Sequence, residues 1–372
     1  MKISEIGSNF FLTPETVSKI KNKKAESQLS MFSGNSAILT ANGSLALKLA
    51  LEQAKSSNKK ALLPNFLCDS IVDAFLSQGF EVDYYPLNPN LSPNIDELNI
   101  KLNNTSYSVL FLCSLFGFNT SGDLYDIVDS LKGKTIIIED ITHSLYSKYK
   151  YTNADYFICS LRKWNEIPDG GALLGSNIDP EKFDGSYPEA TEIVSNFVKA
   201  SNYKYDYFNL GDKSLKTKFR EYYVLVDVAL DALEMTRMSS FSRKVMNSYN
   251  IENLKNRRRK NYMYLAERLL NNKSIEIIFP ELPEDVVPLY MPIYVKNGKR
   301  DDFQRYMAKE DIYCTFHWPV PEHLKKVYNI NSLYIQKNIV SLVIDQRYTC
   351  VDMAKIVKYV NAYSKLEAIK YD

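Results

Sequence analysis

The stretch TIIIEDITHS at residues 135–144, followed by DYFICSLRKWNEIPDGGALLG at residues 155–175, decides the fold of this chain. Each stretch opens with an apolar run that suits a buried strand, and polar residues follow where the run ends. Outward from here, between about residues 36 and 176, short β-rich runs alternate with helical patterns. This alternation predicts a mostly parallel sheet with helices on both faces. Because open sheets of this kind bind ligands beyond the carboxyl ends of their strands, we expect the functional residues there.

Six strands are expected in this region, at residues 61–64, 81–87, 107–113, 135–140, 155–160 and 171–175. Helices are expected between them, notably at 44–55 and 68–78, where apolar residues form one face. Two further helices are expected at 215–234 and through Leu269, separated by the serine-rich stretch 238–242. From about residue 275 the pattern becomes β-rich, with runs at 275–279, 289–295, 312–318 and 340–344 before a closing helix from Asp352. This second pattern predicts a smaller α+β domain.

The composition is that of a well-packed protein. Its 372 residues are 45% apolar and 24% charged, which excludes a disordered chain or a coiled coil. Forty-six basic and 44 acidic side chains leave a net charge of +2, so no nucleic-acid partner is expected. Five widely spaced cysteines without a C-x-x-C pair and only three histidines argue against a zinc site or a His-rich metal site, so no metal is expected; a mixed carboxylate site is the open alternative. The N-terminus has no apolar targeting segment, which predicts a cytoplasmic protein with no membrane partner.

Two motifs at expected element ends could carry chemistry, and each has a structural alternative. In TANGS at residues 40–44, small residues at a helix start would expose backbone N–H groups that favour a phosphate. Asn, Gly and Ser are also ordinary helix caps, so capping is the alternative. At the end of the run 135–140, the carboxylate of Asp140 could hold a cationic ring nitrogen, with His143 over the same ring. The alternative is that Asp140 caps a helix.

A third motif, SLRKWNEIPDGG at residues 160–171, lies between two expected strands. Burial could lower the pKa of Lys163 and make it the amine of a Schiff base, while Ser160 could bind a phosphate. Gly170 and Gly171 permit a tight backbone beside a flat ligand. A lone lysine is usually a surface residue, but a phosphate site, an acid after a strand and a lysine before two glycines occur together here. That order is what a pyridoxal-phosphate enzyme requires.

These motifs resemble those of the DegT/StrS-type aminotransferases, fold-type-I pyridoxal-phosphate enzymes that commonly aminate keto-sugar nucleotides. The resemblance runs from about residue 36 to residue 350. It implies an α/β fold with a mostly parallel seven-stranded sheet, helices on both faces and the smaller C-terminal α+β domain. The implied domains are a large cofactor-binding domain at 27–240 and a small domain at 241–372, with 1–26 packed on it. It also implies pyridoxal 5'-phosphate as the cofactor and a homodimer with shared active sites.

The resemblance assigns roles to individual residues. As catalytic residues it implies Lys163, eight residues before Gly171 as in the family, Asp140 at the ring nitrogen, and His143 over the ring. The further cofactor-binding residues are Asn42, Gly43, Ser44, Phe66, Cys68, Ser160 and Arg237. Within Arg237-Met-Ser, the arginine resembles the residue that reaches the cofactor phosphate of the neighbouring subunit.

The implied function is transfer of an amino group from a donor such as glutamate to a keto acceptor, a keto-sugar nucleotide or related small keto compound used in surface polysaccharides. Arg347 is a candidate clamp for the donor carboxylate, with an ordinary surface arginine as the alternative. Arg162 and His317 are further candidates for the substrate pocket. Two other readings remain open: another pyridoxal-phosphate reaction on a small amino compound, such as that of a decarboxylase or lyase, and a non-catalytic regulator that binds the cofactor.

Overall fold

The computed structural model describes residues 4–22, 36–54, 58–148, 153–176, 178–319 and 329–369. It divides into two compact units that alternate along the chain. Unit 1 comprises residues 1–4, 8–55 and 155–251, and unit 2 comprises residues 5–7, 56–154 and 252–372. The large sheet has seven strands in the order β1-β7-β6-β5-β4-β2-β3, which confirms the predicted α/β class. The predicted domain boundary at residue 240 stays a prediction, and the one at residue 27 lies outside the described residues.

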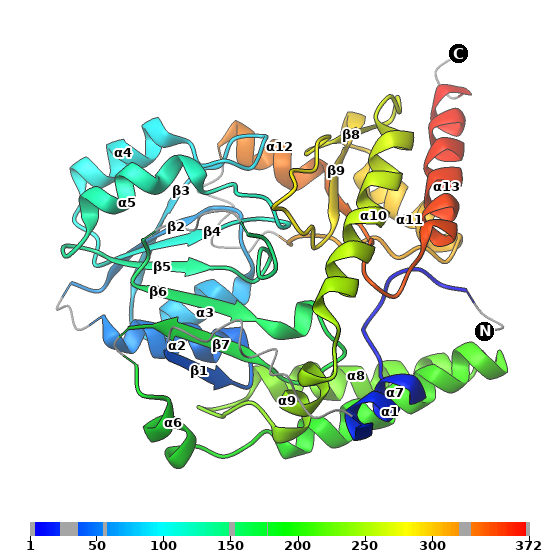
Figure 1. Ribbon diagram of the computed structural model, residues 1–372. Helices are drawn as coiled ribbons and strands as arrows, with labels where there is room; N and C mark the ends of the chain where they lie inside the picture. Colours follow the sequence, from blue (N-terminus) through cyan, green and yellow to red (C-terminus); the bar gives the residue numbers. More distant parts are fainter. Residues whose placement is uncertain are drawn as a thin grey trace. The chain divides into compact units, whose positions relative to one another are not determined.

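Unit 1 contains three strands, β1 (Ser36–Thr40), β6 (Tyr156–Ser160) and β7 (Gly171–Gly175) (Figure 1). Strand β7 pairs antiparallel with both neighbours, and Thr40, Gly171 and Ser160 lie level with one another across the three strands. Because only ten residues join β6 to β7, the connection is too short for the crossover that parallel strands require. This short connection contains the 3-10 turn η3 (Leu161–Lys163). Strand β1 was missing from the expected strands.

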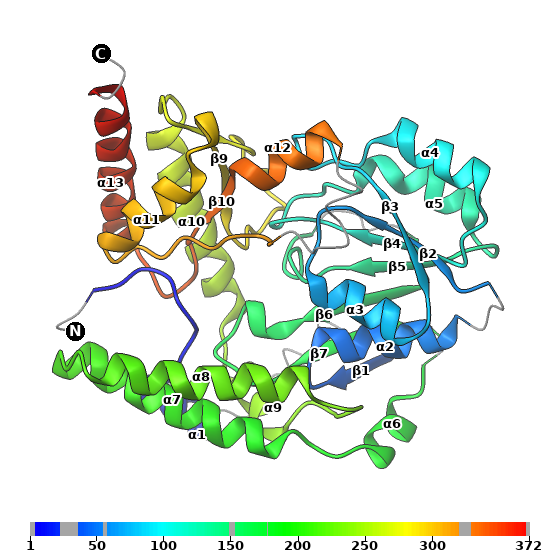
Figure 2. The same cartoon turned by 180° about the vertical axis from the view of Figure 1, so that it is seen from behind.

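The helices of unit 1 are α1 (Pro14–Asn22), α2 (Gly43–Gln53), α6 (Pro180–Ser186), α7 (Thr191–Leu210), α8 (Leu215–Asp231) and α9 (Ser240–Asn247). Helices α7 and α8 form a hairpin whose members lie side by side in both views (Figures 1 and 2). The expected separator at 238–242 is corrected: Ser239 caps helix α9, which begins at Ser240. Serine favours this start because its hydroxyl accepts a hydrogen bond from the N–H of Ser242.

Unit 2 holds the parallel strands β2 (Lys60–Pro64), β3 (Glu81–Tyr85), β4 (Val109–Cys113) and β5 (Ile136–Asp140). The connections contain α3 (Asp69–Ser77), α4 (Ile95–Asn104), the 3-10 turn η2 (Gly122–Leu124) and α5 (Tyr125–Leu131). The strand expected at 81–87 ends at Tyr85, because Pro86 has no N–H to continue the ladder. With the parallel pairs β2–β3, β2–β4 and β4–β5, the prediction of a mostly parallel sheet is confirmed.

A second sheet in unit 2 is antiparallel and consists of β8 (Ile275–Ile277), β9 (Met291–Val295) and β10 (Ile339–Leu342). The accompanying helices are α10 (Ile251–Leu269), the 3-10 turn η4 (Lys296–Gly298), α11 (Arg300–Lys309), α12 (Ile330–Asn338) and α13 (Cys350–Ile369). This confirms the predicted C-terminal α+β pattern. The strand expected at 312–318 is wrong, because only Ile312 and Thr315 form bridges there, with Ile6 and Ser341.

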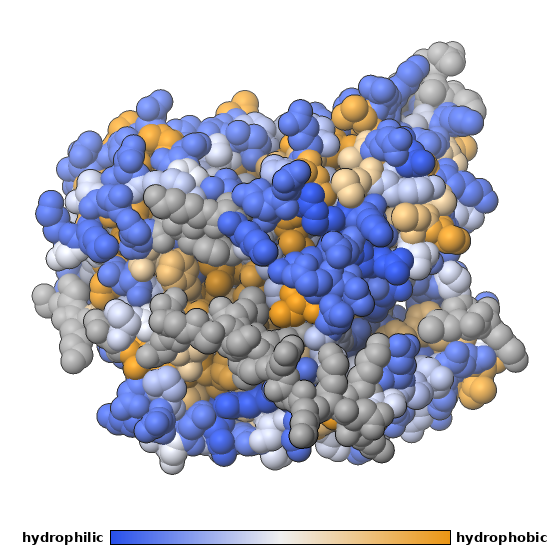
Figure 3. Space-filling view, viewed as in Figure 1, coloured by the Kyte–Doolittle hydropathy of each residue, from blue (hydrophilic) through white to orange (hydrophobic). Residues whose placement is uncertain are grey.

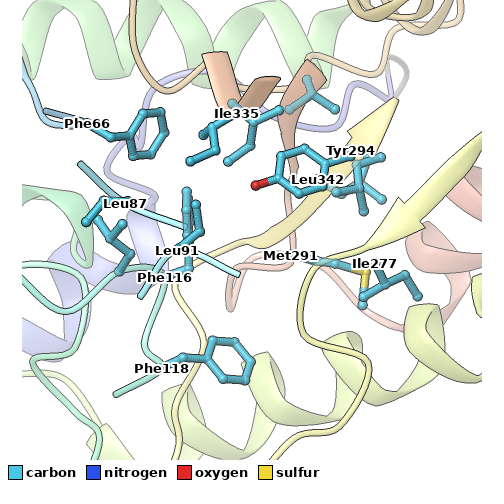
Figure 4. Close-up of a cluster of buried hydrophobic side chains, with 14 of the residues drawn as sticks. Phe66, Leu87, Leu91, Phe116, Phe118, Ile277, Met291, Tyr294, Ile335 and Leu342 are labelled. Carbon is cyan, nitrogen blue, oxygen red and sulfur yellow. The ribbon is translucent and has the colours of Figure 1, made fainter. Parts of the chain in front are cut away.

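One hydrophobic core joins the two sheets of unit 2 (Figure 4). Phe66 and Phe116, which follow strands of the first sheet, share it with Met291 of β9 and Ile335 of α12. Each is at most 3% exposed, and each such side chain stabilises the fold by about 1.5–3 kcal/mol through burial. The outer surface over α10 is hydrophilic, as its arginines and lysines lead one to expect (Figure 3). Of the helices in the described ranges, none is long and apolar enough to cross a membrane.

Candidate functional site

Two glycines bring the start of α2 close to β6 in unit 1. A Cβ at Gly171 would lie 2.2 Å from the carbonyl oxygen of Asn42, so only glycine permits this approach of the two backbones. A Cβ at Gly43 would lie 3.3 Å from the Cβ of Ser160. The start of α2 and Ser160 are therefore neighbours. Backbone N–H groups at a helix start and a hydroxyl are a donor set that suits an anion.

Asn42 also has a structural role at this helix start. Its Oδ1 accepts the N–H of Leu45 at 2.9 Å, and its Nδ2 donates to the carbonyl oxygen of Leu230 in α8 at 3.0 Å. Asn42 therefore caps α2, as the structural alternative predicts. The phosphate-binding role of Asn42, Gly43 and Ser44 stays a prediction.

Lys163 ends the turn η3, three residues beyond Ser160. The turn is fixed by hydrogen bonds from the N–H of Leu161 to the carbonyl of Gly170 and from the N–H of Gly170 to the carbonyl of Ala41. The lysine side chain is half-buried and is followed by the fully buried Trp164. Lys163 therefore lies on a turn that backbone hydrogen bonds hold in place at the end of β6. Its role as the amine that binds a phosphorylated cofactor stays a prediction.

Arg162 and Arg237 have partners within unit 1. The guanidinium of Arg162 pairs with Asp227 of α8 at 3.1 Å. The Nε of Arg237 donates to the carbonyl of Tyr187 at 2.9 Å, and its Nη1 lies 3.5 Å from the carboxylate of Glu189. Both arginines thus stabilise their own unit. The substrate role of Arg162 and the phosphate contact of Arg237 stay predictions.

A buried carboxylate in unit 1 holds the start of α9. Asp169 is fully buried and accepts the N–H and the hydroxyl of Ser239, both at 2.6 Å, and the hydroxyl of Ser242 at 2.5 Å. Burial raises the pKa of Asp169, while these hydrogen bonds act to lower it. In the sequence, Asp169 stood out only as a residue between Lys163 and Gly171. Its function as an anchor for the backbone next to Arg237 depends on contacts between residues 70 positions apart.

In unit 2, Asp140 is the last residue of β5 and lies level with Cys113 of β4. Its Oδ1 accepts the N–H of Thr142 at 2.8 Å, which forms a tight turn directly after the strand. Three residues on, the Nδ1 of the buried His143 accepts the N–H of Phe116 at 3.3 Å. A ring nitrogen that accepts a hydrogen bond carries no proton, so in the neutral ring the proton is on Nε2.

Trp318 joins the predicted aromatic residues of unit 2 into one cluster. Its ring lies 5.1 Å from Phe66 and is stacked at 5.6 Å on His143, centroid to centroid. His317 lies 5.7 Å from His143, and its Nδ1 is 2.9 Å from the hydroxyl of Ser341. The structure therefore brings together the predicted Phe66, His143 and His317 around a tryptophan that sequence reasoning had missed as a site residue.

Cys68 lies at the start of helix α3. It precedes α3 as its N-terminal flanking residue, and its Sγ is 3.2 Å from the hydroxyl of Ser70. Two residues before Cys68, Phe66 has an aromatic ring that contacts the ring of Trp318. The cofactor-binding role of Cys68 stays a prediction.

Arg347 forms a two-point ion pair with Asp345 in unit 2. Its Nε is 2.9 Å from Oδ1 and its Nη2 is 2.7 Å from Oδ2. Burial alone would raise the pKa of Asp345, but Arg347 and the nearby Arg258 hold this pKa below its usual range. Burial lowers the pKa of Arg258 to about 10. One edge of the Arg347 guanidinium is thus occupied, and its role as a clamp for a substrate carboxylate stays a prediction.

The described residues contain no group of three or more histidine, cysteine, aspartate or glutamate side chains that could hold a metal ion. The candidate residues instead form two sets. Unit 1 holds the phosphate-binding candidates and Lys163, whereas unit 2 holds Asp140, the aromatic cluster and Arg347.

Comparison with known proteins identifies similar proteins in sequence and in fold. Residues 237–363 match the DegT/DnrJ/EryC1/StrS aminotransferase family. This segment includes Arg237, His317 and Arg347, whereas Lys163 and Asp140 lie before it. The chain is 28% identical over 114 residues to a dTDP-3-amino-3,6-dideoxy-alpha-D-galactopyranose transaminase from Aneurinibacillus thermoaerophilus. That match covers 29% of this chain and 31% of the length of the relative.

Solved structures with the same fold match over nearly the whole chain. The sugar aminotransferase CalS13 from Micromonospora echinospora matches with a TM-score of 0.67 and 13% identity, covering 97% of this chain and all of that one. PseC from Helicobacter pylori, an aminotransferase involved in pseudoaminic acid biosynthesis, matches with a TM-score of 0.67 and 13% identity, covering 96% of this chain and 98% of the other. At these identities the likeness shows the fold alone, and that fold is the one that the resemblance predicts.

Proposed function

We propose that this chain is a pyridoxal-phosphate-dependent aminotransferase of the DegT/DnrJ/EryC1/StrS family. The family match of residues 237–363 supports the proposal, and the fold shared with solved sugar aminotransferases agrees with it. The proposed enzyme moves an amino group from a donor such as glutamate to a keto acceptor. The acceptor class is a keto-sugar nucleotide or a related small keto compound, since the matched relative is a transaminase of a dTDP-linked amino sugar.

The observation that carries this proposal is the arrangement at the ends of β1, β6 and β7 in unit 1. Gly171 and Gly43 let the N-terminus of α2 and the side chain of Ser160 approach each other, and Lys163 follows on a rigid turn. Backbone N–H groups at a helix start, a hydroxyl and an amine suit a cofactor that carries both a phosphate and an aldehyde.

Unit 2 contains residues whose chemistry suits a flat, cationic ring. Phe66, His143 and Trp318 form an aromatic cluster, against which a flat ring could pack. Asp140 at the end of β5 supplies a carboxylate for a protonated ring nitrogen. When bound, the cofactor would supply an electron sink that stabilises negative charge on the substrate carbon.

The residues of this chain then divide the remaining work. Lys163 would hold the cofactor through its amine and would serve as the base that moves a proton at the substrate carbon. Asp140 keeps the ring nitrogen protonated, because a carboxylate stabilises a cationic N–H more strongly than a neutral acceptor does. His143 would pack against the ring with its proton on Nε2, the tautomer that the Phe116 N–H favours.

Three residues are the candidates for contacts with the substrate: Arg347, His317 and Arg162. Arg347 binds the donor carboxylate, with Asp345 fixing the orientation of its guanidinium through two hydrogen bonds. His317 contributes from the cluster around Trp318, and Arg162 from the residue before the lysine. In a homodimer with shared sites, Arg237 reaches the cofactor phosphate that the second subunit holds. The proposed location of the protein is the cytoplasm.

The test is incubation of the cofactor-loaded protein with glutamate and a panel of keto-sugar nucleotides and small keto compounds. We expect 2-oxoglutarate and an aminated acceptor in equal amounts, and neither product from the Lys163→Ala variant. Release of carbon dioxide in place of 2-oxoglutarate would indicate a decarboxylase. No product from any acceptor, together with no 2-oxoglutarate from glutamate alone, would contradict the proposed activity.

A further inference from the structure

A groove on unit 2 is lined by residues of which none belongs to the candidate site. It has a volume of about 560 Å³ and is formed by β8, β9, α12 and the loop after β3. The residues on which its chemistry depends are Asn90, Glu276, Tyr294, Ile330, Asn331 and Tyr334. We propose that this groove binds a saccharide, specifically a pyranose that bears an ammonium group.

Two tyrosines form an aromatic corner in the groove. The rings of Tyr294 and Tyr334 are 5.0 Å apart with their planes inclined at 62°. Tyr294 is 2% exposed and its hydroxyl donates to the carbonyl of Pro89 at 2.5 Å, so its ring is fixed, whereas Tyr334 is 40% exposed. Ile330, at 83% exposure, extends the apolar wall. The exposed ring of Tyr334, together with Ile330, can pack against the C–H face of a pyranose because that face is apolar.

Polar groups in the groove suit hydroxyls that both donate and accept hydrogen bonds. Asn90 accepts the N–H and the hydroxyl of Ser92 with its Oδ1, at 3.1 and 2.8 Å, which directs its NH₂ group away from Ser92. The side chain of Asn331 makes no hydrogen bond to any residue that the structure describes. Two amides beside an aromatic corner can bind vicinal hydroxyls from the side of the sugar ring.

The charge in the groove determines which class of saccharide fits it best. Glu276 is the one charged side chain among the residues of the groove that the structure describes. Burial raises the pKa of Tyr334, and the negative charge of Glu276 raises it further. A carboxylate favours an ammonium group and repels phosphate, so an amino sugar fits this groove better than a nucleotide or a sugar phosphate.

Helix α12, which provides three of the groove residues, is held in place by contacts outside the groove. Asn329 caps α12 by accepting the N–H of Ser332 at 3.0 Å, and the hydroxyl of Ser332 accepts a hydrogen bond from Asn65 at 2.5 Å. Ile335 is buried in the core. Asn331 and Tyr334 therefore project from a helix whose position is fixed, so binding would cost little ordering of the backbone.

The experiment titrates the holoenzyme with D-glucosamine, N-acetylglucosamine and glucose at mildly acidic pH and follows binding by NMR. We expect glucosamine to bind with a millimolar Kd and the two neutral sugars to bind several times more weakly. Tyr334→Ala should weaken glucosamine binding at least about tenfold, and Glu276→Gln should remove the preference over glucose. The matched controls are Leu333→Ala, an exposed neighbour on α12 outside the groove, and Glu284→Gln, an exposed glutamate elsewhere in unit 2.

Each other outcome overturns part or all of the proposal. If no sugar binds, or if glucosamine binds equally well to the Tyr334→Ala variant, the groove is not a saccharide site. If glucose binds as tightly as glucosamine, the assignment of an ammonium group is wrong. Binding should persist in the Lys163→Ala variant, so a failure of the proposed aminotransferase activity would leave this result unaffected.

Discussion

Replacement of Arg347 by methionine should lower the free energy of unfolding by about 3 kcal/mol. The guanidinium contacts both oxygens of Asp345, at 2.9 and 2.7 Å, and the two side chains are only 14% and 7% exposed. Removal of one partner from a buried pair leaves an uncompensated charge, at a cost of about 3–5 kcal/mol. Arg258 also acts on Asp345, so part of that charge stays compensated and the lower end of the range applies.

Urea unfolding of four proteins measures this directly: the wild type, Arg347→Met, Asp345→Asn and the double variant. The double variant should be more stable than the sum of the two single losses implies, with a coupling free energy of about 2 kcal/mol or more. A loss under about 1 kcal/mol for Arg347→Met, or additive losses in the double variant, would refute the reasoning, since the pair would then be no stronger than an exposed one.

The same pair has a pH signature. Because Arg347 and Arg258 hold the pKa of Asp345 below its usual range, the pair stabilises the fold above the ordinary carboxyl pKa. That contribution disappears as the pH falls through the lower pKa of the folded state. The difference in stability between the wild type and Arg347→Met should therefore shrink on acidification, and a difference that grows instead would show that the sign is wrong.

Three further predictions concern the cofactor residues and their support. Asp140→Asn should fold and bind cofactor yet lose at least about tenfold in turnover, because an amide stabilises the protonated ring nitrogen poorly. His143→Gln should retain measurable turnover. Steady-state kinetics distinguish the two variants. Asp169→Asn should lower the free energy of unfolding in urea by about 2 kcal/mol, because its NH₂ group would face the donors of Ser239, and an unchanged midpoint would contradict that. Light scattering should report twice the 42.8 kDa mass of the chain, and a monomer would exclude a shared site that includes Arg237.

Local patterns in the sequence were sufficient for the central elements of the fold. The apolar run before Asp140 predicted β5 to within one residue, because a buried parallel strand needs apolar side chains on both faces. The run at 312–318 failed for the opposite reason. Its residues have β-forming side chains, but only Ile312 and Thr315 find backbone partners, which lie in remote segments. Pairing between distant segments is not encoded in a local pattern.

The sequence likewise predicted some residues of the candidate site and missed others. Chain order alone predicted site roles for Lys163, Asp140 and the glycine pair, and these roles stay predictions. The close approach of Gly171 to Asn42 gives a physical reason for that glycine. Trp318 was missed as a site residue because its role depends on ring contacts with Phe66 and His143, more than 170 residues earlier in the chain. The partners of Arg347 and Arg237 were equally invisible, since an arginine in a sequence does not reveal which carboxylate it contacts.

The position of the cofactor linkage tests the central claim most directly. The purified protein, loaded with pyridoxal phosphate, is reduced with borohydride, digested and analysed by mass spectrometry. We predict that the reduced cofactor is attached to the peptide containing Lys163, and that prior incubation with glutamate abolishes this labelling because the donor has displaced the lysine amine. Attachment to a different lysine, or labelling of Lys163 that glutamate leaves unchanged, would contradict the proposed aminotransferase mechanism.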